Sequence, residues 1–250
     1  AHEVNTLTDF TSILTAEIGE FWRPAIHLSF FLDHAIFNLN PIGYHLTNVL
    51  LHTISSMLVS IITLQTIKLI SKKEDTKKSY FLPITAGIIF ALFPNHHEAV
   101  TWLAGRTDLL ATTLYLLATT SWLSLLLHKR HTKTKIIATI IFTFLALGAK
   151  EIAITLPIIF TVTTILKYKD IRKTQIFTVI ASWTSAALYL FGRKTTLGSI
   201  SGGYDQQTSI IENFFTSESI IRILKTPILF FQHFINKSEA AYLFTPKKAQ

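Results

Sequence analysis

The chain has 250 residues, of which 49% are hydrophobic and 15% are charged, and its mean hydropathy is +0.41. Soluble domains carry about 25% charged residues, so this composition excludes an ordinary soluble enzyme and indicates a multi-pass membrane protein. The net charge of +8 does not indicate nucleic-acid binding, because about half of the 23 basic residues lie in three short loops between apolar segments. The absence of cysteine excludes disulfides and thiolate metal sites.

The start of the chain predicts one short helix and no membrane span. Residues 1–20 are polar, without periodicity or a signal peptide, and since the chain opens at Ala1 we expect a piece of a longer protein. A helix is predicted from Pro24 to Asn38, with its apolar side chains on one side. Its polar arc holds Arg23, His27, His34 and Asn38. Because this helix is too short and too polar to span, we expect it to lie in the membrane interface; the alternative is a soluble helix packed on another domain.

Apolar segments separated by polar turns predict an all-α polytopic bundle of six to seven transmembrane helices. The six spans cover residues 42–70, 80–93, 100–127, 136–149, 152–166 and 174–191, and residues 218–235 form either a seventh span or a surface helix. One long helix over 136–166 is rejected, because it would far exceed the about 20 residues that a span needs. The predicted domains are an outer loop remnant with the interfacial helix (1–41), the bundle (42–235) and a tail of unassigned order (236–250).

Three loops set the predicted topology. Residues 71–79, 128–135 and 167–173 are rich in Lys and Arg, so the positive-inside rule places all three in the cytoplasm. The turns at 94–99 and 148–152 and a polar loop at 192–217 then face the outside or an organelle lumen. The second, fourth and fifth spans are too short for a hydrocarbon core of about 30 Å, so we expect the outer turns to surround a depression.

A polar segment at residues 94–108, which reads PNHHEAVTWLAGRTD, lies between two apolar runs and is the main candidate site. Ionisable side chains at membrane depth are costly unless they face protein or water; the alternative is a short loop near the surface. Guanidinium binds phosphate in a bidentate way and ammonium acts as a point charge, so Arg106 and Lys150 are the candidate phosphate ligands. The candidate catalytic residues, able to transfer or orient a proton, are His96, Glu98 and Asp108.

Further polar side chains are expected around the same depression as a substrate cavity: Arg23, His27, His45, Asn48, His52 and Glu151. The first span carries a helical stripe of His45, Asn48, His52 and Ser55, which either lines the cavity or hydrogen-bonds neighbouring helices. Lys150 and Glu151 are alternatively a solvated turn. No cofactor is assigned, because His96-x-Glu98 lacks the helical spacing of a metal motif; a divalent metal there is the alternative.

Several motifs resemble one family over residues 21–166. Residues 22–24 read WRP, 39–52 read LNPIGYHLTNVLLH, 93–100 read FPNHHEAV, 105–110 read GRTDLL and 149–151 read AKE. They are similar to the membrane part of polyprenyl-phosphate-sugar-dependent glycosyltransferases of the GT-C fold. Within that class they most resemble the transmembrane O-mannosyltransferases and their bacterial relatives with tetratricopeptide repeats. Phe93 replaces the first histidine of the family's histidine motif, which weakens any metal or proton relay that needs it.

The resemblance implies sugar transfer, of inverting type, from a polyprenyl phosphate to an acceptor hydroxyl on a protein or glycan. It implies an integral protein of the bacterial inner membrane or the endoplasmic reticulum, acting at the outer or lumenal face. Relatives carry an acidic pair on the first outer loop, thought to include the catalytic base, and Glu3 and Asp9 do not form such a pair. We therefore expect this chain to bind the donor without transferring sugar. The rival functions are a secondary transporter, which needs discontinuous helices at mid-membrane, and a non-catalytic scaffold.

Overall fold

The computed structural model describes residues 21–70, 80–128, 130–166 and 171–198. Its helices are α2 (Pro24–Phe37), α3 (Pro41–Ile70), α4 (Phe81–Leu92), α5 (His96–Thr101), η3 (Leu103–Gly105), α6 (Arg106–Leu127), α7 (Thr132–Ala149), η4 (Glu151–Ile154), α8 (Thr155–Leu166) and α9 (Lys173–Leu197). The all-helical class is thereby confirmed. The expected seventh span, the tail and residues 1–20 lie outside the described residues.

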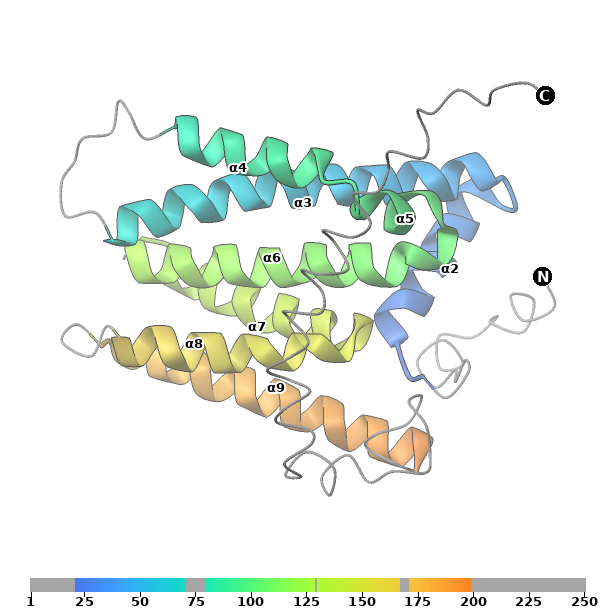
Figure 1. The fold of residues 1–250 in the computed structure, drawn as a ribbon. Helices are drawn as coiled ribbons and strands as arrows, with labels where there is room; N and C mark the ends of the chain where they lie inside the picture. Colours follow the sequence, from blue (N-terminus) through green and yellow to red (C-terminus); the bar gives the residue numbers. More distant parts are fainter. Residues whose placement is uncertain (1–20, 71–79, 129, 167–170, 199–250) are drawn as a thin grey trace, which may run out of the picture. The chain divides into compact units, whose positions relative to one another are not determined.

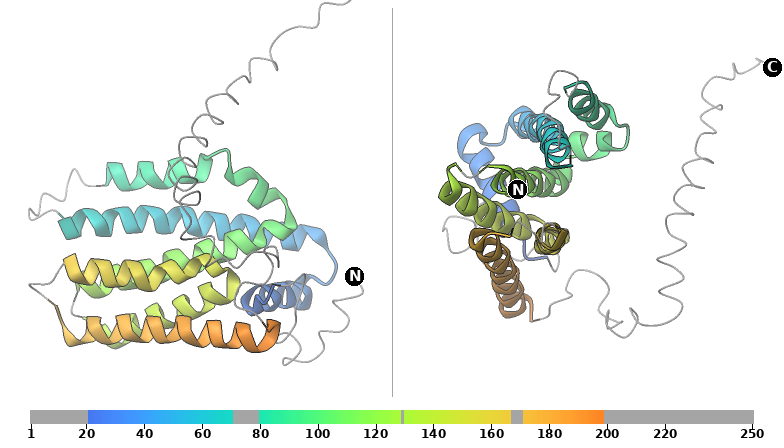
Figure 2. Two further views of the ribbon diagram at one scale, coloured as in Figure 1. Left: turned by 60° about the horizontal axis from the view of Figure 1, so that its bottom comes forward. Right: turned by 90° about the vertical axis from the view of Figure 1, so that its left-hand side faces the viewer.

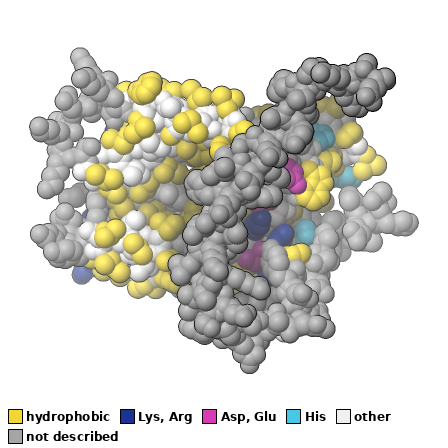
Figure 3. Space-filling model, in the orientation of Figure 1, with side chains coloured by type: hydrophobic (Ala, Val, Ile, Leu, Met, Phe, Trp, Pro, Cys, Tyr) yellow, Lys and Arg dark blue, Asp and Glu magenta, His cyan; other side chains and the backbone are white. Residues whose placement is uncertain are grey.

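Four helical segments are long and apolar enough to cross a membrane: Pro41–Ile70, Leu103–Leu127, Thr132–Ala149 and Lys173–Leu197. Helix α4 and the segment formed by η4 and α8 are apolar but shorter. Hydrophobic side chains cover the visible face of the long helices (Figure 3). These observations support a membrane protein, and the number of six to seven spans stays a prediction beyond the four.

Helices α3, α4, α6, α7, α8 and α9 alternate in direction along the chain (Figures 1 and 2). Helices α3, α6 and α8 end at the same end of the bundle, where α4, α7 and α9 begin. The opposite end holds α2, α5, η3 and η4, and we call it the polar end. The described helix ends that flank the three basic segments therefore share one end of the bundle, as the predicted topology requires. This arrangement also confirms that residues 136–166 form two helices, because α7 ends at Ala149 and α8 returns.

Helix α6 lies at the centre, between α3 and α7 (Figure 2, right). Its side chains Ala118, Trp122 and Leu125 are fully buried. The Trp122 ring stacks on Phe160 of α8 at 4.9 Å between centroids, and its indole N–H donates to Thr163 Oγ1 at 2.9 Å. A buried tryptophan with its polar atom satisfied is a stable anchor, so these contacts fix α8 against α6.

Two helix boundaries correct the prediction at the polar end. Helix α9 continues to Leu197, so the polar loop predicted from residue 192 was wrong at its start. The reason is that Arg193 is buried and pairs with Glu151, which extends a buried polar stripe along α9. Helix α6 begins at Arg106 and not at Val100, because Trp102 has an extended conformation that separates α5 from η3.

At the other end, α7 begins at Thr132, four residues before the predicted start. The loop predicted over 128–135 is therefore partly helical. Lys135 in the first turn donates to the carbonyl oxygens of Ser124 and His128, each at 3.2 Å. Lysine commonly satisfies the free carbonyls at a helix C-terminus, and here it does so for the end of α6.

Helix α2 forms over the predicted residues and packs against α7, α3 and α6. It buries Ile26, His27 and Asp33, while Leu32 and Ile36 are exposed. His27 and Asp33 therefore face the bundle together with Ile26, and Leu32 and Ile36 point outward. Its position in a membrane interface stays a prediction.

Candidate functional site

Described histidine, acidic and basic side chains gather at the polar end on the face shown in Figure 3. Most of them belong to four neighbouring structures: a buried network around Arg106, an ion-pair cluster around Glu151, a groove between α6 and α8, and a cavity beside α2.

The Arg106 network joins α2, α3 and α6. The Arg106 side chain has no exposed surface, and Nη2 lies 2.7 Å from Asp33 Oδ2. Nε donates to Asn48 Oδ1 at 2.5 Å, Nη1 to Ser29 Oγ at 2.9 Å, and Nη2 also to the Tyr44 carbonyl at 2.8 Å. A buried charge is tolerated only when it is paired and hydrogen-bonded in this way.

These contacts give Arg106 a different role from the predicted one. All three of its nitrogens donate to protein acceptors, and the guanidinium also faces the Phe30 ring at 5.0 Å. It has no exposed donor to offer a phosphate, so the network positions α2 and α6. This geometry does not support the predicted phosphate-binding role of Arg106.

Asn48 and Ser55 resolve part of the open question about the polar stripe on α3. The amide of Asn48 donates to the carbonyls of Val100 and Trp102, at 3.4 and 3.2 Å, and so holds the segment between α5 and η3. Ser55 shares a 2.9 Å hydrogen bond with Thr113 of α6. Both side chains are buried and join helices, which is the interhelical alternative. His45, in contrast, is exposed.

The Glu151 cluster joins α2, η4 and α9. Glu151 accepts from Arg23 Nη2 at 3.0 Å through Oε2 and from Arg193 Nη1 at 2.5 Å through Oε1. Arg193 also donates to the Tyr189 hydroxyl at 3.3 Å, and Tyr189 stacks on Trp22. Burial opposes ionisation of Glu151, but the hydrogen bonds from both arginines outweigh it and lower the pKa of its carboxyl below the usual range. The cluster therefore holds Glu151 ionised.

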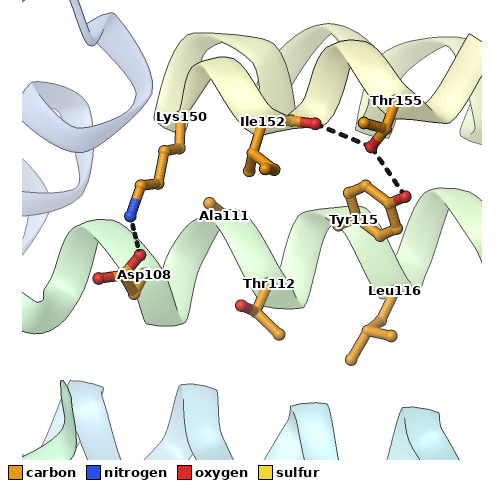
Figure 4. Close-up of a pocket in the computed structure, with 8 residues that line it drawn as sticks. All are labelled: Asp108, Ala111, Thr112, Tyr115, Leu116, Lys150, Ile152 and Thr155. Carbon is orange, nitrogen blue, oxygen red and sulfur yellow. Dashed lines mark hydrogen bonds and ion pairs between the residues drawn. The ribbon is translucent and has the colours of Figure 1, made fainter. Parts of the chain in front are cut away.

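A groove between α6 and α8 brings together two of the predicted site residues, Asp108 and Lys150 (Figure 4). It has a volume of about 380 Å³, and its lining residues are Asp108, Ala111, Thr112, Tyr115, Leu116, Lys150, Ile152 and Thr155. At one end Lys150 Nζ contacts Asp108 Oδ1, with 30% of the lysine and 56% of the aspartate side chain exposed. At the other end the Tyr115 hydroxyl and Thr155 Oγ1 are 3.0 Å apart. The groove is thus charged at its mouth and mainly apolar along its walls.

A second hollow, the α2 cavity, lies beside the first turn of α6. It has a volume of about 340 Å³ and is lined by Phe21, Arg23, Ile26, His27, Phe30, Ala104 and Thr107. Two of the predicted cavity residues, Arg23 and His27, line it. The Arg23 guanidinium lies over the Phe21 ring at 4.1 Å.

His96 and His52 lie elsewhere, near the C-terminus of α4. His96 Nδ1 is 2.9 Å from the Phe90 carbonyl, and His52 Nε2 is 3.1 Å from the Ala91 carbonyl. Their rings meet edge to face at 5.4 Å. Glu98 is exposed on α5. The described contacts of the His96 ring are with His52, Phe90 and Phe93, away from the groove between α6 and α8. Among the described side chains no group of three or more potential metal ligands converges.

Sequence reasoning missed Asp33 and Arg193, the partners in the two ion-pair clusters. The sequence does contain a feature that indicates the role of Asp33: it is an acidic residue within an apolar helix, and such a residue requires a cationic partner. The sequence also contains a feature that indicates the burial of Arg193. A polar stripe with spacings of three and four residues runs along α9 and ends at Arg193; its other members are Gln175, Thr178, Ser182, Ser185 and Tyr189.

No family model and no solved structure matches this chain. Curated relatives do match. The protein O-mannosyl-transferase Tmtc1 of Drosophila melanogaster is 37% identical over 134 residues, 54% of this chain and 14% of that protein. The human TMTC2 is 36% identical over 129 residues, with 51% and 14% covered, and the human TMTC3 is 37% identical over 101 residues, with 40% and 10% covered.

Over about half of its length, this chain is similar to proteins named protein O-mannosyl-transferases. The similarity confirms the resemblance that the sequence motifs predicted. The chain spans between 10% and 14% of the length of these three O-mannosyl-transferases.

Proposed function

We propose that this chain contributes the donor site of a membrane glycosyltransferase that moves mannose from a polyprenyl phosphate to a hydroxyl group of an acceptor protein. The observation that carries the reaction class is its similarity to proteins named protein O-mannosyl-transferases. The site acts at the outer or lumenal face, since the polar end lies opposite the helix ends that the basic segments of the sequence connect.

The groove between α6 and α8 supports this proposal by its chemistry. A polyprenyl-phosphate sugar has a charged head and a long apolar tail. Lys150 at the mouth of the groove provides an exposed cation for the phosphate, and Ala111, Leu116 and Ile152 provide apolar wall. Lys150, rather than Arg106, is the phosphate ligand in this proposal, because its ammonium group is partly exposed.

The transfer step needs a proton acceptor. The acceptor oxygen forms a bond to the anomeric carbon, the bond from that carbon to the phosphate oxygen breaks, and polyprenyl phosphate leaves with the electron pair. The hydroxyl proton goes to a carboxylate within about 2.6–3.2 Å, directly or through one water. Asp108 is the described carboxylate at the groove mouth and is the base that we propose; Glu98, exposed on α5, is the alternative. His96 holds the end of α4 through the Phe90 carbonyl and has a positioning role.

The rival functions have less support from the fold. A transporter is expected to interrupt its helices near mid-membrane. The described interruptions, η3 and η4, lie together at the polar end (Figure 1). A scaffold needs no groove with a charged mouth.

The test is transfer of labelled mannose from polyprenyl-phosphate mannose to membrane and secreted proteins, in cells that express the gene product containing this chain. Asp108→Asn should lower transfer by about a hundredfold or more, the usual contribution of a general base. Lys173→Gln, at the opposite end of the bundle, is the matched control and should transfer normally. If Asp108→Asn is active and Glu98→Gln is inactive, Glu98 is the base.

A further inference from the structure

The α2 cavity and the α6–α8 groove share a wall built from two pairs of consecutive residues. Thr107 lines the cavity and Asp108 lines the groove. Lys150 lines the groove, and the next residue, Glu151, binds Arg23, which lines the cavity. The first turn of α6 therefore separates two hollows, with Asp108 on the groove side.

The two hollows differ in chemistry. The groove mouth carries a lysine paired with an aspartate. None of the described residues that line the α2 cavity is acidic; Arg23, which is paired with Glu151 of η4, is the cation in this lining, and His27 adds an imidazole. The hydroxyl of Thr107 and the rings of Phe21 and Phe30 complete the lining. Such a surface fits a ligand that has carboxylates, hydrogen-bonding groups and some apolar contact area, and that lacks positive charge.

We propose that the α2 cavity binds the acceptor polypeptide, and that it selects acceptor serines or threonines flanked by acidic residues. The proposal rests on the proposed function and extends it to a second substrate. Arg23 can offer its guanidinium to an acidic side chain of the acceptor while it keeps Nη2 on Glu151. Charge complementarity is the argument for this occupant over a basic or neutral peptide.

In this arrangement the donor and the acceptor approach the first turn of α6 from different sides. The donor approaches from the groove, the acceptor approaches from the cavity, and the first turn of α6 lies between them. Asp108 lies beside the donor and follows Thr107 directly in the chain, so an acceptor hydroxyl that reaches past Thr107 meets both the sugar and the proposed base. Binding each substrate on its own side lets the polypeptide enter and leave without displacing the lipid.

Two volume-filling variants separate the sites without touching an ion pair. Ala104→Trp fills the α2 cavity, and Thr112→Trp fills the groove. The first measurement is binding of a fluorescent peptide, with one threonine between acidic residues, to this chain in nanodiscs of neutral lipid without donor. A peptide of equal length with lysine flanks is the control. We expect the acidic peptide to bind at least about tenfold more tightly and to weaken as salt rises.

Ala104→Trp should remove this peptide binding, and Thr112→Trp should leave it unchanged. In the mannose-transfer assay Ala104→Trp should raise KM for the acceptor at unchanged KM for the donor, and Thr112→Trp should do the reverse. Peptide binding that survives Ala104→Trp would overturn the inference. A donor KM that rises in this variant would also overturn it and would assign the cavity to the donor. Because peptide binding is measured without donor, the acceptor site can stand or fail independently of mannose transfer.

Discussion

Arg106 Nη2 of α6 lies 2.7 Å from Asp33 Oδ2 of α2, and both side chains are almost completely buried. This contact holds α2 over the first turn of α6, so the walls of both hollows depend on it. Arg106 was predicted to bind phosphate, and in the structure its guanidinium is instead buried against Asp33.

Breaking this pair should destabilise the bundle. Arg106→Met or Asp33→Leu alone leaves an uncompensated buried charge, which costs about 3–5 kcal/mol. The double variant should lose much less than the sum of the two, because no charge is left unpaired. Thermal unfolding in detergent measures these losses of stability. Lys173→Met, at an exposed position at the end of the bundle opposite the polar end, is the control. Additive losses would show that the two residues act separately.

Gly87 of α4 tests the packing of α4 on α3. A Cβ atom there would lie 2.0 Å from Ser60 Oγ and 2.9 Å from the Ser56 carbonyl oxygen. Gly87→Ala should therefore cost about 1–3 kcal/mol through overpacking. The matched control is Gly148→Ala in α7, where the nearest atom to an added Cβ is 3.5 Å away, so no loss of stability is expected. Equal melting temperatures for Gly87→Ala and wild type would contradict this helix contact.

Lys150 and Asp108 should respond differently to substitution, although they contact each other. Lys150→Met should weaken binding of polyprenyl phosphate about tenfold or more through loss of a charge-assisted hydrogen bond. Asp108→Asn removes a competitor for Lys150, so lipid binding should be equal or tighter while mannose transfer is lost. Neither variant should change melting much, since partly exposed ion pairs contribute about 0–1 kcal/mol. Equal loss of lipid binding in both variants would mean that the pair acts only as a structural unit.

The topology can be read directly, because the chain contains no cysteine. Single cysteines at Lys133 and Lys173 should react with an impermeant maleimide only from the cytoplasm. Cysteines at Asn95 and Thr195 should react only from the opposite side. All four positions are exposed in the structure. Labelling of Lys133 and Asn95 from one side would place the proposed site on the wrong face.

The sequence predicted the helices better than their contacts. Apolar length and basic loops were enough to place α3, α4, α8 and the break after Ala149. The ends of α6, α7 and α9 were misplaced, because long-range partners decide them: Asn48 holds the carbonyls before α6, Lys135 binds the end of α6, and Glu151 draws Arg193 into α9.

Contacts between distant residues also limited the prediction of the candidate site. The motif around residues 94–108 marked the polar end correctly, yet local spacing cannot tell a buried arginine from a ligand-binding one. That distinction depends on Asp33, which is 73 residues away along the chain. Likewise, Asp108 and Lys150 were both predicted site residues, but only the fold shows that they share one groove.

Photo-crosslinking tests the central claim most directly, namely that the α6–α8 groove binds a polyprenyl-phosphate sugar. A polyprenyl phosphate with a photoreactive group near its head would be irradiated with the chain in nanodiscs, and the labelled peptides identified by mass spectrometry. We predict label on α6 and α8 around Thr112, Ile152 and Thr155, with competition by polyprenyl-phosphate mannose and none by the phosphate-free polyprenol. Label instead between α3 and α4, in the hollow lined by Met57 and Gly87, or label that the alcohol displaces equally well, would contradict the account.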